Sequence, residues 1–227
     1  MEIFLFWKFS SEVFTVFMKG YIFKKIVVGY ETNCYIFRKE GTDRGPAVVI
    51  DPGDDLNVIK SALFDMNAYP SLVLLTHGHF DHILAVGDLR TTRTTVAIHK
   101  LDGHYLTEQD TFTSVLPYDP RPFAPADFLF EKEGRYNING FEFTLLHTPG
   151  HTEGSVCYIF GDNIFTGDTL FKGTIGRTDF FGGNVGQMMN SLGRLKRYPG
   201  EFKVYPGHGG STQLSYERQF NPYMLKA

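Results

Sequence analysis

Short apolar runs, rich in β-branched and aromatic residues and separated by glycine and proline, dominate the chain from Tyr21 onward. Runs of this length and composition are typical of β-strands. The strands predicted are 22–28 and 33–38 as a hairpin, then 47–50, 71–76, 95–98, 135–138, 141–146, 155–160, 163–165 and 203–205. The 71–76 run is almost wholly apolar, which indicates a strand buried on both faces of a sheet.

Helical periodicity is confined to a few segments. Leu56, Ile59 and Leu63 recur at the spacing of one helix face and predict a helix over 56–64, with Asp54 or Asp55 as its N-cap. Further helices are predicted over 82–91 and 185–197, a proline-rich loop over 110–127, and a helical or irregular tail from 211. Two groups of strands with helices between them favour sheets packed face to face with helices outside.

The composition is that of an ordinary soluble globular protein, with 42% hydrophobic and 21% charged residues. A net charge of -3 without a basic block argues against nucleic acid or an anionic membrane as the main partner. Residues 1–18 are predicted to be an N-terminal extension of uncertain role, and residues 19–227 a single domain. Lys8 and Glu12 interrupt the extension, and it lacks the small-residue end of a signal peptide, so we expect no membrane span.

The two cysteines, Cys34 and Cys157, each lie in an apolar, strand-like run. They are too few for a disulfide framework and do not form a Cys-x-x-Cys pair. We therefore expect two small buried hydrophobic side chains rather than catalytic thiols, and a protein of the reducing cytoplasm.

Potential metal ligands follow the apolar strand at 71–76 directly. Three imidazoles and a carboxylate occur within six residues, in the run His77-Gly78-His79-Phe80-Asp81-His82. Such nitrogen and oxygen donors suit zinc, iron or manganese. Gly78 is expected to let the chain turn sharply so that neighbouring side chains converge.

Three more potential ligands follow later predicted strands in the same way. They are His151, Asp168 and His208, and each comes directly after a glycine. Residues at successive strand ends can lie along one rim of a sheet, so we expect all seven ligand groups to meet there.

This series resembles the metallo-β-lactamase superfamily, from about Lys19 to the end of the chain. The resemblance implies an α/β fold, the αβ/βα four-layer sandwich with two mixed β-sheets and helices outside, and two divalent metal ions, zinc first with iron or manganese as alternatives. It implies that His77, His79 and His151 hold the first ion. Asp81, His82 and His208 would hold the second ion, with Asp168 bridging the two.

Within that superfamily the chain is similar to short bacterial members of the glyoxalase-II-like branch. The similarity lies in the runs Gly167-Asp168-Thr169-Leu170-Phe171, Ile175-Gly176-Arg177-Thr178-Asp179 and Pro206-Gly207-His208-Gly209. It implies hydrolysis of S-lactoylglutathione or a related acyl-thioester by a metal-bridging hydroxide, with Asp81 and Asp168 as catalytic residues. The chain lacks a Gly-x-Ser-x-Gly elbow, in agreement with a mechanism that uses no serine nucleophile.

The thiol half of the substrate stays open. Full-length glyoxalase II enzymes continue with a helical domain that binds glutathione, whereas 19 residues follow His208. Arg177 and, with less support, Lys172 are candidate contacts for a substrate carboxylate. An ion pair between Arg177 and Asp179 is the competing interpretation. His99 and His147 are expected to support the core or the ligands, and His104 to lie at the surface.

Two alternatives remain at this point. One is a persulfide dioxygenase with a single iron ion held by two histidines and an aspartate; its last histidine is typically followed by aspartate, where this chain has Gly209. The other is a metal-stabilised binding module without turnover. The native metal, the acyl group and the oligomeric state are not fixed by the sequence.

Overall fold

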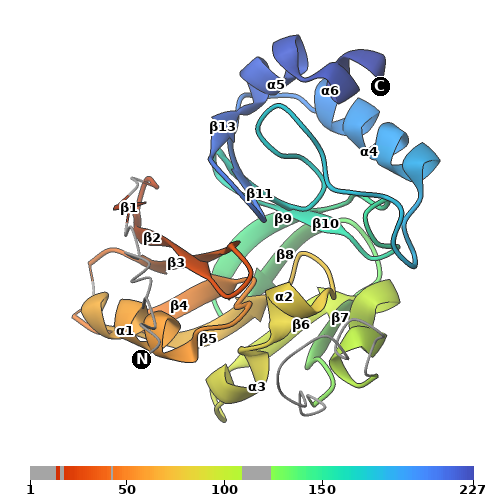
Figure 1. Cartoon of the computed structure of the whole chain (residues 1–227). Helices are drawn as coiled ribbons and strands as arrows, with labels where there is room; N and C mark the ends of the chain where they lie inside the picture. The colour runs from red at the N-terminus through yellow and green to blue at the C-terminus, as the bar shows by residue number, and fades with distance from the viewer. Residues whose placement is uncertain (1–13, 16–17, 42, 109–123) are drawn as a thin grey trace, which may run out of the picture.

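The computed structural model describes residues 14–15, 18–41, 43–108 and 124–227, which form two mixed β-sheets (Figure 1). In the first sheet the strands lie in the order β1 to β7: Phe14–Thr15, Tyr21–Val28, Thr32–Lys39, Gly45–Ile50, Ala68–Leu74, Thr95–His99 and Phe128–Phe130. The second sheet has the order β13-β12-β11-β10-β9-β8. From β8 to β13 its strands are Gly134–Ile138, Phe141–His147, Val156–Phe160, Asn163–Gly167, Lys203–Pro206 and Thr212–Gln213.

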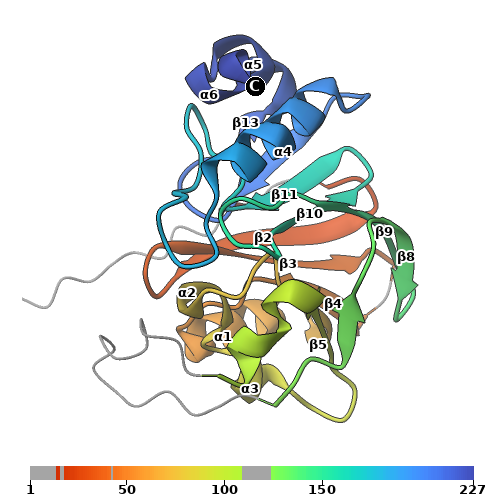
Figure 2. The same ribbon diagram turned by 90° about the vertical axis from the view of Figure 1, so that its right-hand side faces the viewer.

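The sheets stack face to face, and helices cover the outer side of each (Figure 2). Against the first sheet lie α1 (Leu56–Asp65), α2 (Phe80–Ile83), α3 (Val86–Leu89) and the 3-10 helix η1 (Lys100–Leu106). Against the second lie α4 (Val185–Arg197), α5 (Leu214–Phe220) and α6 (Pro222–Lys226). The predicted four-layer sandwich is confirmed.

Side-chain alternation along the strands explains the four layers. In β4, Val48 belongs to the core between the sheets, and Val49 to the core beneath the first helical layer. In β10, Tyr158 faces the other sheet, and Cys157 lies in the core beneath α4. Because both faces of these strands are buried, they read as continuous apolar runs in the sequence.

Aromatic rings fill the space between the sheets. Phe37 of β3 stacks on Phe165 of β11 with ring centroids 5.6 Å apart, and Phe165 stacks on Tyr205 of β12 at 5.2 Å. Each fully buried ring contributes about 2–3 kcal/mol of transfer free energy. The Phe37–Phe165 contact crosses between the two sheets, whereas Phe165 and Tyr205 stack on neighbouring strands of the second sheet.

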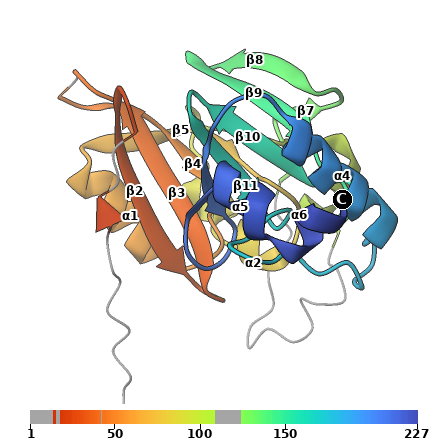
Figure 3. The same ribbon diagram turned by 90° about the horizontal axis from the view of Figure 1, so that it is seen from above.

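Two parallel strand pairs bring the predicted ligands to the same edge. In the first sheet β4 pairs with β5, with Ile50 opposite Leu74. In the second sheet β11 pairs with β12, with Gly167 opposite Pro206. The residues that follow each pair of strands therefore leave their sheet side by side; Figure 3 shows the two sheets from above.

Hydrogen bonds join the two sheets at this edge. The amide of Asn33 donates to the carbonyl of Gly207 (2.7 Å), and the amide of Val156 donates to the carbonyl of Thr76 (2.9 Å). The Tyr158 hydroxyl donates to the carbonyl of Leu75 (2.8 Å). The loops that carry ligands are thus fixed to the opposite sheet as well as to their own.

Some local predictions were wrong. The helix expected over 82–91 is two short helices, α2 and α3, because the amide of Ala85 donates to the carbonyl of Pro52 (3.0 Å) instead of continuing the helix. Asp55 is the N-cap residue of α1, one of the two predicted, although its carboxylate accepts from the amide of Gly29 (2.9 Å) and makes no cap bond. The strand β7 and the helix η1 were not predicted.

Most of the predicted extension over 1–18, and residues 110–123 of the predicted loop, lie outside the described residues. Phe14 and Thr15 form β1, which pairs antiparallel with β2, and Met18 is buried. Both cysteines are buried and free, as predicted. Within the described residues, no helix is both long and apolar enough to cross a bilayer.

Candidate metal centre

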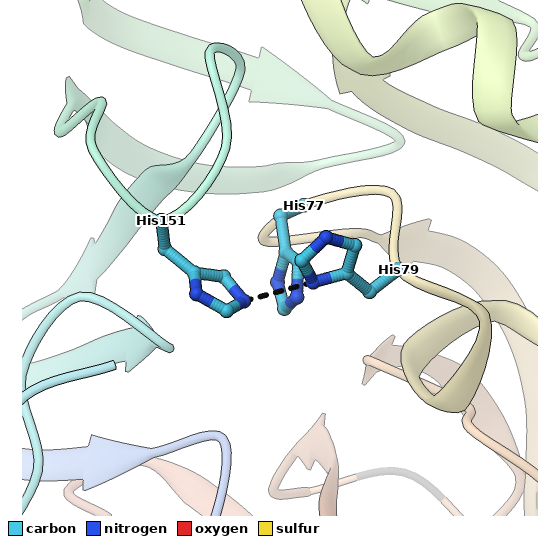
Figure 4. A group of neighbouring side chains, drawn as sticks. All are labelled: His77, His79 and His151. Carbon is cyan, nitrogen blue, oxygen red and sulfur yellow. Dashed lines mark hydrogen bonds between the residues drawn. The ribbon is translucent and has the colours of Figure 1, made fainter. Parts of the chain in front are cut away.

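The loop after β5 and the helix α2 that follows it carry four of the predicted ligands, and three histidines meet at this loop. His77 and His79 of this loop face His151, which follows β9 (Figure 4). Nδ1 of His79 lies 2.8 Å from Nε2 of His151. All three side chains are buried, and their nitrogens lie within 4.8 Å of one another. We call this set the three-histidine cluster.

A second group forms around α2, which follows the same loop. It consists of Asp81 and His82, together with His208, which follows β12. Oδ2 of Asp81 lies 3.4 Å from Nε2 of His82 and 3.2 Å from Nε2 of His208. We call this set the Asp-His-His cluster.

Asp168 lies between the two clusters. Its Oδ2 is 3.4 Å from Nε2 of His151 and 3.7 Å from Nε2 of His208, and its Oδ1 is 3.5 Å from Nε2 of His82. One carboxylate therefore reaches ligand atoms of both clusters. The structure brings all seven predicted residues to one place.

Fixed partners orient the histidine rings. Nδ1 of His151 donates to the carbonyl of Arg177 (2.7 Å), and Nδ1 of His208 donates to the carbonyl of Glu31 (3.1 Å). Nδ1 of His82 lies 3.0 Å from Oδ2 of Asp51. A partner of this kind fixes the tautomer, so Nε2 of each ring remains for the centre.

Asp51, directly after β4, was not among the predicted site residues. This buried carboxylate accepts from the amide (2.8 Å) and the hydroxyl (2.7 Å) of Thr76, as well as facing His82. Its φ of 51° is unusual for a residue other than glycine and points to a constrained position. The signal available was its place at the end of β4, next to the strand that leads to His77.

Glycine is required where the loops touch. A Cβ on Gly207 would lie 2.1 Å from Oδ1 of Asp168, and one on Gly167 would lie 2.3 Å from Oγ1 of Thr76. Gly167 also has a φ of 47°. The φ of Gly78 is not positive, so glycine is needed there for space: a Cβ would lie 2.2 Å from Cδ2 of Tyr105.

Burial and the neighbouring histidines keep part of the centre neutral. They lower the pKa of His77 well below 6.5 and that of His79 to about 3. Burial alone would raise the pKa of Asp81, but His82 and His208 hold it below the usual range. Burial also opposes charge on His82, yet Asp81, Asp168 and Asp51 raise its pKa to about 10.

The donor set fits a metal centre. Within the described residues, the buried Nε2 of His77 and Oδ1 of Asp168 have no hydrogen-bond partner. Leaving such atoms unsatisfied costs about 1–3 kcal/mol each, so a native protein is expected to give them one. Both atoms belong to residues whose other neighbours are imidazole nitrogens and carboxylate oxygens, the ligands of zinc, iron and manganese.

The remaining candidates lie further out. Arg177 makes a two-pronged pair with Asp179 (2.7 and 2.8 Å) and stacks over Phe180 at 3.5 Å, while Lys172 is exposed. His99 is buried and stacks on His147 at 4.2 Å, away from the three groups of possible ligands. His104 is exposed, as predicted.

Fold and site define a class: a four-layer αβ/βα sandwich with a histidine-rich metal site at one edge. A sequence model of the metallo-β-lactamase superfamily matches residues 27–208. A probable metallo-hydrolase of Streptococcus pyogenes serotype M6 is 32% identical, over 92% of this chain and 92% of its own. Hydroxyacylglutathione hydrolase GloC of Haemophilus influenzae is 31% identical, over 87% of this chain and 95% of its own.

Solved structures agree. The BLEG-1 B3 metallo-β-lactamase has a TM-score of 0.81 and 36% identity, with 89% of this chain and 99% of the other covered. TTHA1623, in a di-iron-bound form, has a TM-score of 0.72 and 33% identity (88% and 98% covered). ETHE1 from Myxococcus xanthus has a TM-score of 0.72 and 31% identity (88% and 83% covered). The chain therefore belongs to the metallo-β-lactamase superfamily, whose metallo-hydrolases bind divalent metals at such sites.

Proposed function

We propose that this protein is a two-metal hydrolase of thioesters. The three-histidine cluster holds one ion, the Asp-His-His cluster holds the other, and Asp168 bridges them. The observation that carries the proposal is the position of Asp168, whose two oxygens lie 3.4–3.7 Å from histidines of both clusters. Similarity to the hydroxyacylglutathione hydrolase GloC supports thioesters as the substrate class.

The residues of the chain have distinct tasks in this reaction. When bound, two divalent ions lower the pKa of water and polarise a carbonyl group. Asp81 is fixed by the hydroxyl of Thr32, which donates to its Oδ2 (3.1 Å), so its carboxylate is held in one orientation at the centre. Asp168 sets the spacing of the two clusters. Asp81 and Asp168 are therefore the proposed catalytic residues.

Substrate contacts are proposed for the loop that follows Asp168. Lys172 is exposed on this loop, and Arg177 lies over Phe180, whose ring centroid is 6.0 Å from that of His79. Because Asp179 occupies the guanidinium, Asp179→Asn is expected to lower the KM for a carboxylate-bearing thioester if Arg177 binds it. Arg177→Ala is expected to raise that KM with little change in kcat.

A thioester panel tests the function. Zinc-, iron- and manganese-loaded protein is assayed for thiol release from S-lactoylglutathione and other acyl-thioesters. Hydrolysis is expected in protein that holds two ions, and His79→Ala or Asp168→Ala is expected to lose metal and activity together. Retained activity in either variant would contradict its assignment.

The second candidate, a persulfide dioxygenase, holds one iron with two histidines and an aspartate, so four of the seven residues gathered here would have no role in it. One iron ion per chain, with oxygen uptake on glutathione persulfide, would establish that alternative and overturn the hydrolase. A protein that binds two ions but leaves every thioester intact would instead be a binding module. We also propose that the protein acts in the cytoplasm on a small molecule, without nucleic acid or membrane as partner.

A further inference from the structure

A buried carboxylate outside the ligand set lies behind the three-histidine cluster. Asp102 belongs to the 3-10 helix η1 and is 1% exposed. Its Oδ2 accepts from the amide of Gly78 (2.9 Å) and the hydroxyl of Thr152 (2.7 Å), and its Oδ1 accepts from the amide of Gly154 (2.7 Å). Both carboxylate oxygens of Asp102 therefore accept hydrogen bonds from protein donors.

The donors come from the two loops that carry the cluster. Gly78 lies between His77 and His79, on the loop that follows β5 of the first sheet. Thr152 follows His151, on the loop between β9 and β10 of the second sheet. A single side chain thus ties both halves of the three-histidine cluster together.

The residues around this carboxylate are tightly packed. A Cβ on Gly154 would lie 2.4 Å from Oδ1 of Asp102, and one on Gly78 would lie 2.2 Å from the Tyr105 ring of the same 3-10 helix. Ser155 holds Thr152 in turn, because its Oγ accepts from the Thr152 amide (3.0 Å) and bonds the Thr152 hydroxyl (2.7 Å). The helix η1 therefore packs directly against both loops.

We propose that Asp102 is a positioning residue: its hydrogen bonds to Gly78, Thr152 and Gly154 fix His77 and His79 relative to His151 and so set the metal affinity of the three-histidine cluster. The inference rests on the proposed two-metal centre. The Asp-His-His cluster does not share these contacts, so the effect of losing them is confined to one of two ions.

The test compares isosteric variants. Asp102→Asn keeps one acceptor oxygen but replaces the other with an amide that faces a donor. Thr152→Val removes one donor, and Thr152→Ser retains it as the matched control. Each protein is titrated with Zn²⁺ and with Co²⁺, and metal content, dissociation constants and the visible Co²⁺ spectrum are recorded.

Wild type is expected to bind two ions. Asp102→Asn is expected to bind one of them about 10–100-fold more weakly, the usual effect of removing an outer partner of a metal site, with an altered Co²⁺ spectrum. Thr152→Val should show a smaller change of the same kind, and Thr152→Ser none.

The failures are distinguishable. If wild type binds no ion, both the proposed function and the role of Asp102 are refuted. If wild type binds two ions and the variants bind both with unchanged affinity and spectrum, only the role of Asp102 is overturned, even if their melting temperatures drop. If Asp102→Asn does not fold, Thr152→Val against Thr152→Ser decides in the same way.

Discussion

Among single residues outside the predicted ligand set, Asp51 connects the chain before His77 with the ring of His82. Its Oδ1 accepts from the amide of Thr76, and its Oδ2 accepts from the Thr76 hydroxyl and faces Nδ1 of His82. Asp51 thus fixes both the residue before His77 and the ring of His82. Since Asp51 is 1% exposed, water cannot replace its hydrogen bonds.

We predict that Asp51→Asn weakens metal binding about 10–100-fold. Asparagine tolerates the φ of 51°, so the backbone is retained, but it has one acceptor oxygen where the carboxylate has two. Its amide nitrogen therefore faces either the Thr76 amide, or the Thr76 hydroxyl and Nδ1 of His82, in place of an acceptor. The measurement is competition of Zn²⁺ between the protein and a chelator of known affinity. Asp88→Asn, at an exposed position of α3, is the control and should bind as wild type does. Equal affinities in both variants would remove Asp51 from the support of the centre.

His99 gives a prediction about pH. Burial, with the nearby His147 and Lys100, lowers its pKa to about 4. The unfolded chain takes up a proton near pH 6.5 that the folded protein refuses, so this residue reduces stability progressively as pH falls from about 6.5 to about 4.

The variant His99→Asn is expected to lessen that acid sensitivity by about 1–2 kcal/mol, because asparagine does not titrate and its oxygen can accept from the Leu101 amide as His99 does. Urea denaturation of metal-stripped protein at pH 7.5 and pH 5 measures the difference. If wild type and variant lose the same stability over this interval, His99 does not carry the effect.

On the scale of secondary-structure elements, the parallel pairs β4–β5 and β11–β12 decide where ligands meet. The second pair leads to Asp168 and His208, and their loops touch at Gly207. The φ of Gly207 is not positive, so glycine is needed there for space rather than for backbone freedom.

We predict that Gly207→Ala abolishes binding of at least one ion. The new methyl group would lie 2.1 Å from Oδ1 of Asp168 and 2.8 Å from Cε1 of His82, so both side chains must move. Gly210→Ala is the matched control, since a Cβ there meets nothing within 4 Å. Metal content after gel filtration reports the outcome. Two ions per chain in Gly207→Ala would show that the loop yields without disturbing the ligands.

Helices and strands were predictable where the hydrophobic pattern of the segment itself determines its structure. The apolar strands and α4 follow from alternation and periodicity, and their predicted bounds agree with the structure to within a few residues. The break between α2 and α3 depends on the hydrogen bond from the amide of Ala85 to the carbonyl of Pro52. The cap bond of α1 is missing because the carboxylate of Asp55 accepts from the amide of Gly29. Such contacts join residues distant in sequence, so no local pattern reveals them.

For the molecule as a whole, the sequence predicts the candidate ligands better than their support. The seven side chains follow strand ends, where their residue types stand out. Asp51 and Asp102 also follow or flank strands, but their roles depend on which amides reach them across the sandwich. The proposed centre therefore joins the two sheets twice, through its ligands and through the hydrogen bonds behind them.

This arrangement predicts that metal removal loosens the sandwich at one edge. Ligands of each ion come from loops of both sheets, so an ion bound to the folded state stabilises their union. At a free metal concentration 100-fold above the dissociation constant, one site adds about 2.7 kcal/mol. For a chain of this size that is a change of about 5–10 °C in melting temperature.

Differential scanning calorimetry with and without a chelator measures the loss, and hydrogen exchange locates it. The amides of Val156 and Asn33, which bond across the sheets beside the centre, should lose protection, whereas that of Ile59 in α1 should not. His79→Ala should show a smaller chelator effect than wild type, and His104→Ala an equal one. An unchanged melting temperature after complete metal removal would mean that the packing of the aromatic rings between the sheets suffices to hold this edge closed.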